Sequence, residues 1–175
     1  DMTHYDTIAR EGWIRMTPTV GRFKDEKGSP TYLGLRQPSL WFEYTAALDI
    51  QLAAGGEAGI AVIQGENHTL KLAVHVKDSE KVIQLITTID GVDEVHGETT
   101  MTASELELKF VGEGQKLKGI VVARGEEIVV AEDVATHYLS TELAGGFVGC
   151  TVGIYTSSDV EEPGYVDANW IKLTK

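Results

Sequence analysis

The feature that most constrains the fold is a strict alternation of side-chain character from Leu40 to Leu52. Every second residue of this run, starting with Leu40, is apolar or aromatic, and the residues between them are mostly polar. Successive side chains of an extended strand point to opposite faces of a sheet. The run therefore predicts one long strand with a single buried face.

Comparable patterns recur along most of the chain. The run from Ala58 to Ile63 is almost entirely small or branched and apolar, which is typical of a central strand covered on both faces. Asp90-Gly91 is a strong hairpin signal. No segment combines a helical repeat with helix caps. The other segments that we expect to be strands are 13–16, 70–76, 82–89, 92–98, 105–111, 117–123, 126–133, 148–154 and 165–173.

Many short strands at close spacing, without helices, predict an all-β fold, either an antiparallel sandwich or a barrel. The 175 residues contain no internal repeat and no linker, and 42% of them are hydrophobic, which is enough for one core. We therefore expect a single β-sandwich domain over residues 1–175.

Composition excludes several classes of partner. The net charge of −12 would repel both nucleic acid and an anionic membrane surface, so we expect neither as a partner. No apolar run is long enough to cross a bilayer, and since the sequence does not open with a leader-like run, we expect a signal peptide to be absent or already removed. A soluble protein is expected, and the cytoplasm and secretion both remain open as its location. Cys150 is the only cysteine and lies in a strand pattern, which favours a buried apolar role over a nucleophilic one.

Metal sites have little support in the sequence. The histidines never occur at metal-ligand spacing, so each is expected to be an ordinary surface or strand residue. We expect no cofactor. The sequence leaves open a structural calcium ion held by Asp6 and Asp167, if the terminal strands pair, because calcium prefers carboxylate oxygens. The histidines are His4, His68, His75, His96 and His137.

Paired acids matter because glycoside hydrolysis needs two carboxyl groups on either side of the scissile bond. Glu105 and Glu107 share one face of a predicted strand, but the next alternate position is Lys109, which breaks the run of three acids found in sandwich-fold glucanases. These glutamates are interpreted as the solvated face of a strand. Glu66 and Glu142, in polar or aromatic loops, are better placed to meet a ligand.

Two loops offer a binding surface. Gln64, Glu66 and His68 gather at one predicted turn, where amide, carboxylate and imidazole groups suit sugar hydroxyls. Tyr138 and Phe147 could supply flat apolar faces. Phe147 follows the pair Gly145-Gly146, which permits a sharp turn. Two interpretations remain open, a ring folded into the core behind a hairpin turn and a ring displayed outside the domain.

Four motifs, in order, resemble one known domain. The run from Gly56 to His68, followed by Leu70-Lys71-Leu72, is similar to a stretch typical of the C-terminal sandwich of glycoside hydrolase family 43, the β-xylosidases and α-L-arabinofuranosidases. The segment 138–149 resembles the second hallmark of that domain. Residues 30–37 resemble its arginine-glutamine strand, and residues 167–170 resemble its closing strand. The match covers about residues 12–173.

The resemblance implies a concanavalin A-like β-sandwich (a jelly roll of two antiparallel sheets) attached to a five-bladed propeller that carries the catalytic carboxylates. It also implies that an aromatic-tipped loop of the sandwich helps to close the pocket for a xylo- or arabino-oligosaccharide. Here that loop is 143–148, and its aromatic residue is Phe147. This chain itself is expected to lack a catalytic centre, and its parent protein is expected to be a glycoside hydrolase.

The sequence departs from the family pattern in places. Gly65 stands where the family usually has asparagine, and residues 2–11 match the usual opening poorly. One alternative is a free-standing carbohydrate-binding module that uses Trp41 and the outward face of residues 40–52. The other is an independent sandwich-fold hydrolase, which would need two acids facing each other.

Overall fold

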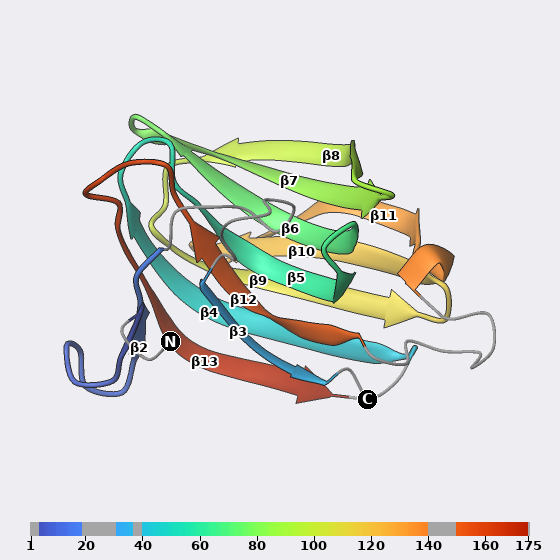
Figure 1. Ribbon diagram of the computed structural model, residues 1–175, viewed down its shortest axis with the longest axis horizontal. Helices are drawn as coiled ribbons and strands as arrows, with labels where there is room; N and C mark the ends of the chain where they lie inside the picture. Colours follow the sequence, from blue (N-terminus) through green and yellow to red (C-terminus); the bar gives the residue numbers. More distant parts are fainter. Residues whose placement is uncertain (1–3, 19–30, 37–39, 140–149, 175) are drawn as a thin grey trace.

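The computed structural model describes residues 4–18, 31–36, 40–139 and 150–174, and these residues form a sandwich of two antiparallel sheets (Figure 1). One sheet has seven strands, in the order β1 (Tyr5–Asp6), β2 (Ile14–Met16), β13 (Gly164–Thr174), β4 (Phe42–Leu52), β9 (Glu105–Glu113), β10 (Lys116–Ala123) and β11 (Glu126–Ala135). The other has six, in the order β3 (Thr31–Arg36), β12 (Thr151–Ser157), β5 (Glu57–Gly65), β6 (His68–Lys77), β7 (Glu80–Ile89) and β8 (Val92–Met101).

Strand β4 is the long strand that the alternation predicts. It lies between β13 and β9 in the seven-stranded sheet. Its inward side chains are buried, and its outward side chains include Glu43, Thr45 and Ala47. A period of two thus separates a core face from an outer face along the whole strand. The buried inward residues are Phe42, Tyr44, Ala46, Leu48 and Ile50.

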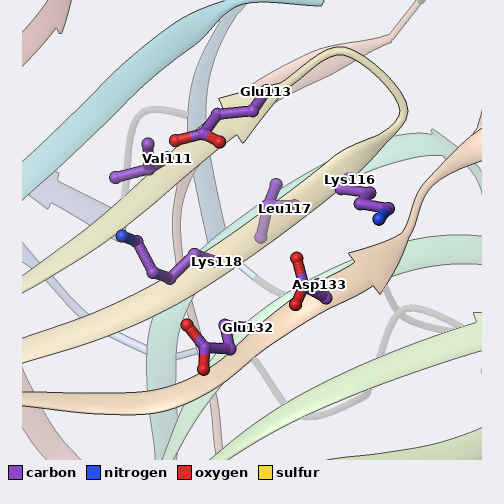
Figure 2. Close-up of a pocket in the computed structure, with 7 residues that line it drawn as sticks. All are labelled: Val111, Glu113, Lys116, Leu117, Lys118, Glu132 and Asp133. Atoms are coloured by element: carbon purple, nitrogen blue, oxygen red, sulfur yellow. The ribbon is translucent and has the colours of Figure 1, made fainter.

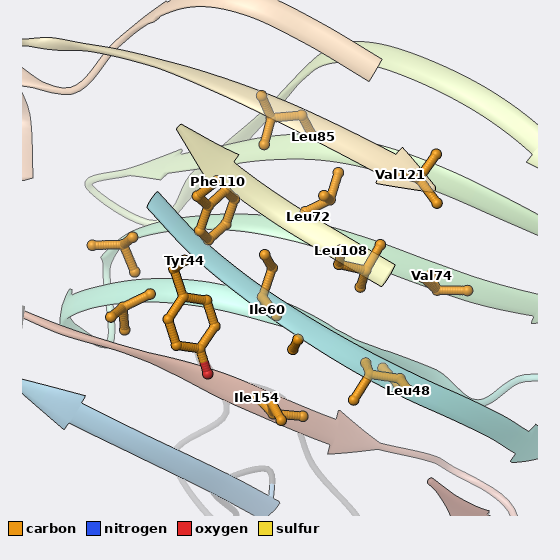
Figure 3. Close-up of a cluster of buried hydrophobic side chains, with 14 of the residues drawn as sticks. Tyr44, Leu48, Ile60, Leu72, Val74, Leu85, Leu108, Phe110, Val121 and Ile154 are labelled. Carbon is orange, nitrogen blue, oxygen red and sulfur yellow. The ribbon is translucent and has the colours of Figure 1, made fainter. Parts of the chain in front are cut away.

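The core fills the space between the two sheets (Figure 3). Tyr44, Leu108 and Phe110 of the seven-stranded sheet contribute to the same buried cluster as Ile60 and Leu72 of the six-stranded sheet. Burying large apolar side chains in this way is the main favourable term in folding.

The outward face of the six-stranded sheet is also covered at its centre. A second buried cluster contains Ala61, Ala73, Ile86 and Tyr155, and Glu57 is buried beside it. The prediction that the central strand over residues 58–63 is covered on both faces is confirmed by β5.

Turn chemistry agrees with the sequence at two hairpins. Asp90 and Gly91 have φ values of 51° and 80°, and they join β7 to β8. Arg124 and Gly125 have φ values of 52° and 75° between β10 and β11. Two consecutive residues with positive φ form the turn that matches the twist of a two-residue hairpin.

The two-sheet antiparallel sandwich expected from the sequence is confirmed. Sequence patterns did not predict β1, which is short and, within the described ranges, pairs with β2 alone. The strand expected over residues 148–154 begins at Thr151 in the described part, and Val148 lies outside the described residues. Among the described residues, no helix has the length and apolar character needed to span a membrane.

Candidate functional site

One end of the six-stranded sheet carries the β5–β6 turn, whose polar residues the sequence suggests as ligand contacts. The β5–β6 turn carries Gln64, Glu66 and His68, with Glu66 exposed and the other two partly buried. It lies beside the β7–β8 turn, because the Gly91 N–H donates to the Asn67 carbonyl oxygen at 3.2 Å. His68 Nε2 is 3.1 Å from Asp90 Oδ1, which links the two turns a second time.

Tyr138 lies on a short 3₁₀ helix, η2 (His137–Leu139), at the same end of the sheet. Its hydroxyl donates a hydrogen bond to the Thr69 carbonyl oxygen of β6 at 3.0 Å. Burial raises the pKa of Tyr138 above its ordinary value. The phenol therefore fastens η2 to the start of β6, next to the turn that carries His68.

Two buried residues fix the ends of the segment 140–149. Leu139 and Cys150 are both fully buried, and the Cys150 thiol donates to the Leu139 carbonyl oxygen at 3.1 Å. Burial raises the pKa of Cys150 to about 11, so the thiol is uncharged near neutral pH. The expectation that Cys150 has a buried, apolar role agrees with this environment. The chain then enters β12, where Thr151 pairs with Ile63, one residue before Gln64.

Glu142 and Phe147, the two expected pocket residues within this segment, lie outside the described residues. The described part shows where the segment starts and ends. The flanking residues Leu139 and Cys150 lie at the end of the six-stranded sheet that also carries Tyr138 and the Gln64–His68 turn.

The two calcium candidates do not adjoin in the sheet. Strand β2 lies between β1 and β13, and Arg15 of β2 is the register partner of both Asp6 and Asp167. Arg15 Nε is 2.8 Å from Asp167 Oδ1, so a guanidinium already supplies positive charge to that carboxylate. Asp6 accepts hydrogen bonds from the backbone N–H groups of Ile8 and Ala9, which lower its pKa. In the described ranges, no group of three His, Cys, Asp or Glu side chains could hold a metal ion.

A buried charge cluster on β5 and β6 was missed by the sequence reasoning. Glu57 Oε2 accepts hydrogen bonds from Lys71 Nζ at 2.9 Å and Tyr155 Oη at 2.8 Å, and Glu57 Oε1 is 3.3 Å from His75 Nδ1. The available signal was a carboxylate placed directly before an apolar run, with Lys71 and His75 at outward positions of the next strand. His75, expected to be an ordinary strand residue, is a member of this cluster.

Three hollows lie on the seven-stranded sheet, and none of the three is lined by Gln64, Glu66, His68 or Tyr138. The one in Figure 2 has a volume of about 70 Å³ and lies across β9, β10 and β11. The hollow is too small for a sugar ring to enter with its substituents. Its charged side chains are mixed in sign and comprise Glu113, Lys116, Lys118, Glu132 and Asp133.

A larger hollow contains both Glu105 and Glu107, the pair of acids considered above for hydrolysis. They project from the same face of a single strand, β9, and Glu105 Oε1 is 3.7 Å from Arg10 Nη2. A glycosidase needs its two carboxyl groups on either side of the bond that it cleaves. Neighbours on one strand approach a ligand from the same side, so this pair does not meet that requirement.

Two antiparallel sheets of seven and six strands around one apolar core place the chain among the concanavalin A-like β-sandwiches. The family model of the β-xylosidase C-terminal concanavalin A-like domain matches residues 1–174, and the chain belongs to this family. The resemblance stated on the sequence motifs is therefore confirmed.

Individual relatives are longer than this chain. A protein of Butyrivibrio fibrisolvens named xylosidase/arabinosidase is 30% identical over 136 residues, which are 77% of this chain and 26% of the relative. A glycoside hydrolase family 43 protein from Bacillus licheniformis has a TM-score of 0.87 at 22% identity, over 99% of this chain and 35% of its own. A xylan β-1,4-xylosidase from Bacillus halodurans C-125 has a TM-score of 0.85 at 18% identity, over 100% of this chain and 35% of its own.

Proposed function

We propose that this chain is an accessory domain of a β-xylosidase or α-L-arabinofuranosidase of glycoside hydrolase family 43. It carries no catalytic centre of its own. Its task is to hold the segment 140–149, with Phe147, against the substrate pocket of a five-bladed propeller that supplies the catalytic carboxylates. The pocket accepts a xylo- or arabino-oligosaccharide.

The observation that carries this proposal is the double anchor of the segment. Leu139 and Cys150 are buried and hydrogen-bonded to each other, so the two residues that flank 140–149 are held close together at one end of the six-stranded sheet. A segment held in this way can present one aromatic ring at a defined position. A ring supplied by a second domain excludes water and limits substrate movement without taking part in proton transfer.

Family membership and the length of the relatives give further support. The chain spans 26% of the Butyrivibrio relative and 35% of the two Bacillus proteins, which leaves room in such proteins for a separate catalytic domain. The names of these relatives are the source of the xylosidase and arabinosidase activities proposed here.

The test is to measure hydrolysis of an aryl β-xyloside by this chain alone, and by this chain joined to the propeller domain of a family 43 xylosidase. We expect no turnover by the chain alone and activity from the joined protein. Phe147→Ala should lower kcat/KM of the joined protein about 10- to 100-fold, because it removes a positioning contact. Val129→Ala, a change at an exposed apolar residue of β11, is the control and should leave kcat/KM unchanged.

Two results would contradict the proposal. One is hydrolysis by the chain alone that a single Glu105→Gln or Glu107→Gln change abolishes, since that would make the sandwich itself the enzyme. The other is a Phe147→Ala protein with the kcat/KM of the parent, since the segment would then have no role in the pocket.

A further inference from the structure

The outer face of the seven-stranded sheet is hollowed along β4. The outward side chains of this middle strand are small at Thr45 and Ala47, whereas those of both neighbouring strands are large. Small residues on one strand between two rows of large residues leave a channel that runs along the strand. The large residues are Trp170 and Lys172 of β13, and Glu107 and Lys109 of β9.

Two adjacent hollows make up this channel, with volumes of about 290 Å³ and 190 Å³. Both are lined by Glu107 and Trp170, so they adjoin at these two residues. We call the whole feature the Trp170 groove. The lining residues used below are Trp13, Glu43, Glu105, Glu107, Lys109, Arg124, Asn169, Trp170 and Lys172.

A β-bulge turns Trp170 into the groove. Ala168 pairs with Leu48 and faces the core, but the next pair in register is Trp170 with Ala47, which leaves Asn169 as an extra residue. If Asn169 took its own place in the register instead, strict alternation would direct position 170 toward the core, as at Ala168. Trp170 is instead 41% exposed. Bulges of this kind re-aim a side chain, and they are common next to functional sites.

Trp13 stands at one end of the groove and is held in place from behind. The Arg10 guanidinium carbon lies 3.6 Å from the centroid of the Trp13 ring. Arg10 is itself fixed by Asp49, at 2.9 Å, and by Asp167, at 3.5 Å. An aromatic ring held by a cation–π contact and an ion-pair network loses less freedom when a ligand stacks on it.

The charges of the groove balance, with Glu43, Glu105 and Glu107 against Lys109, Arg124 and Lys172. A charged polymer of either sign would leave some of these groups without a partner. A neutral chain rich in hydroxyl groups would satisfy both signs, because a hydroxyl donates to carboxylates and accepts from cations and from the Asn169 amide. Its apolar ring faces suit the two tryptophans.

We propose that the Trp170 groove binds a neutral oligosaccharide chain, with sugar rings stacked on Trp13 and Trp170 and hydroxyl groups bonded to the charged side chains between them. The site is non-catalytic and lies on the opposite sheet from the β12 anchor of the 140–149 segment. It would hold a polysaccharide near an attached catalytic domain. This proposal stands independently of the pocket-closing role.

The test is calorimetric titration of the 175-residue chain with xylohexaose and cellohexaose, both of them neutral. We expect saturable binding of at least one of them. Trp170→Ala and Trp13→Ala should each weaken that binding about tenfold or more, because central aromatic contacts dominate such interfaces. Trp170→Phe should keep most of the affinity. Trp41→Ala is the matched control, since Trp41 is exposed but does not line the groove, and it should bind as the parent does.

The proposal is overturned if the parent chain binds neither neutral oligosaccharide, or if Trp170→Ala binds as tightly as the parent while its unfolding midpoint is unchanged. Tighter binding of polygalacturonate than of either neutral chain would also overturn it. Loss of docking to a propeller domain in the Trp170→Ala chain would overturn it as well, because the groove would then be a surface between two domains. Hydrolysis of a small aryl xyloside by the joined protein should be insensitive to Trp170→Ala, which separates this test from that of Phe147.

Discussion

At the scale of single residues, Glu57 is a carboxylate enclosed by charged and polar partners. It is 3% exposed, and Lys71, Tyr155 and His75 surround its carboxylate. Burial on its own would raise the pKa of Glu57. The attraction of Lys71 and His75, together with the hydrogen bonds that Lys71 and Tyr155 donate, outweighs burial, so the pKa is lowered overall. The charged form is therefore favoured by folding.

Replacing Glu57 by Gln should lower the free energy of unfolding by about 3 kcal/mol at pH 7, because it leaves buried charge without its partner. The folded-state pKa of Glu57 is below its ordinary value of 4.5. The stabilisation is thus complete above pH 4.5 and is lost as the pH falls through the folded-state value. Urea unfolding should be measured at neutral pH and at acid pH below the ordinary pKa of Glu57. We expect the difference in free energy of unfolding between the parent and the Glu57→Gln protein to disappear in acid.

Glu66→Gln is the control for this experiment, because Glu66 is an exposed carboxylate in a turn, and it should change stability by no more than about 0.5 kcal/mol. A Glu57→Gln protein as stable as the parent at neutral pH, or one whose deficit is the same in acid, would show that the buried charge does not contribute as described.

Tyr44 gives a prediction of opposite sign. Its side chain is fully buried in the core, and among the described residues no group forms a hydrogen bond with its hydroxyl (Figure 3). Burying a polar group without a partner costs free energy. Tyr44→Phe should therefore raise the free energy of unfolding by about 1 kcal/mol, measured by urea denaturation.

Tyr155→Phe is the matched comparison, since the Tyr155 hydroxyl donates to Glu57. It should destabilise the protein by about 1–3 kcal/mol because the acceptor is buried and charged. If Tyr44→Phe destabilises to a similar extent, its hydroxyl must have a partner in solution.

At the scale of elements, β5 contains two glycines with opposite surroundings. A Cβ on Gly59 would lie 2.0 Å from the Leu72 carbonyl oxygen of β6, whereas a Cβ on Gly65 would meet nothing within 4 Å. Gly59→Ala should cost about 3 kcal/mol of stability, because backbone atoms of two paired strands must separate. Gly65→Ala should change stability by no more than about 0.5 kcal/mol.

Thermal and urea unfolding of the two glycine variants check this pair of expectations. An equal effect of both substitutions would mean that β5 and β6 can shift apart locally without loss of pairing.

The sequence predicted the strands with strong periodicity and missed features that depend on registry. Alternation in β4 and the Asp90-Gly91 turn both have local causes, and the structure agrees with both. The extra residue at Asn169 moves the apolar alternation of β13 from Val166 and Ala168 to Ile171 and Leu173, but the apolar Trp170 between them hides this change of phase. Trp170 was therefore not assigned a role, although the carbohydrate-binding alternative did use the outward face of residues 40–52, which forms the floor of the groove. The carbohydrate-binding alternative also used Trp41, but Trp41 precedes β4 and lies beside Gly114 of the β9–β10 turn, and it does not line the groove.

At the scale of the whole molecule, the candidate site was predicted in part. The clustering of Gln64, Glu66 and His68 follows from their place in one turn. Their proximity to Tyr138 and to the β7–β8 turn depends on pairing between distant strands, which periodicity does not encode. Glu57 shows the same limit, since its partners come from β6 and β12 and meet it only when the sheet has formed.

The molecule presents its two proposed surfaces on different sheets, with the core between them. The Trp170 groove lies on the seven-stranded sheet, and the anchors of the 140–149 segment lie on η2 and at the start of β12 in the six-stranded sheet. Substitutions far apart with no shared contacts have nearly additive effects. Changes in one surface should therefore leave the other intact.

The bond between Cys150 and Leu139 has a consequence for how such domains diversify. It fixes the distance between Leu139 and Cys150 that the residues between them must span, whatever their sequence. Doubling the number of residues across a fixed gap costs only about 0.6 kcal/mol of closure entropy. If residues 140–149 close a sugar pocket as proposed, the sequence between Leu139 and Cys150 can change during evolution, and the sugar preference with it, while the two sheets stay the same.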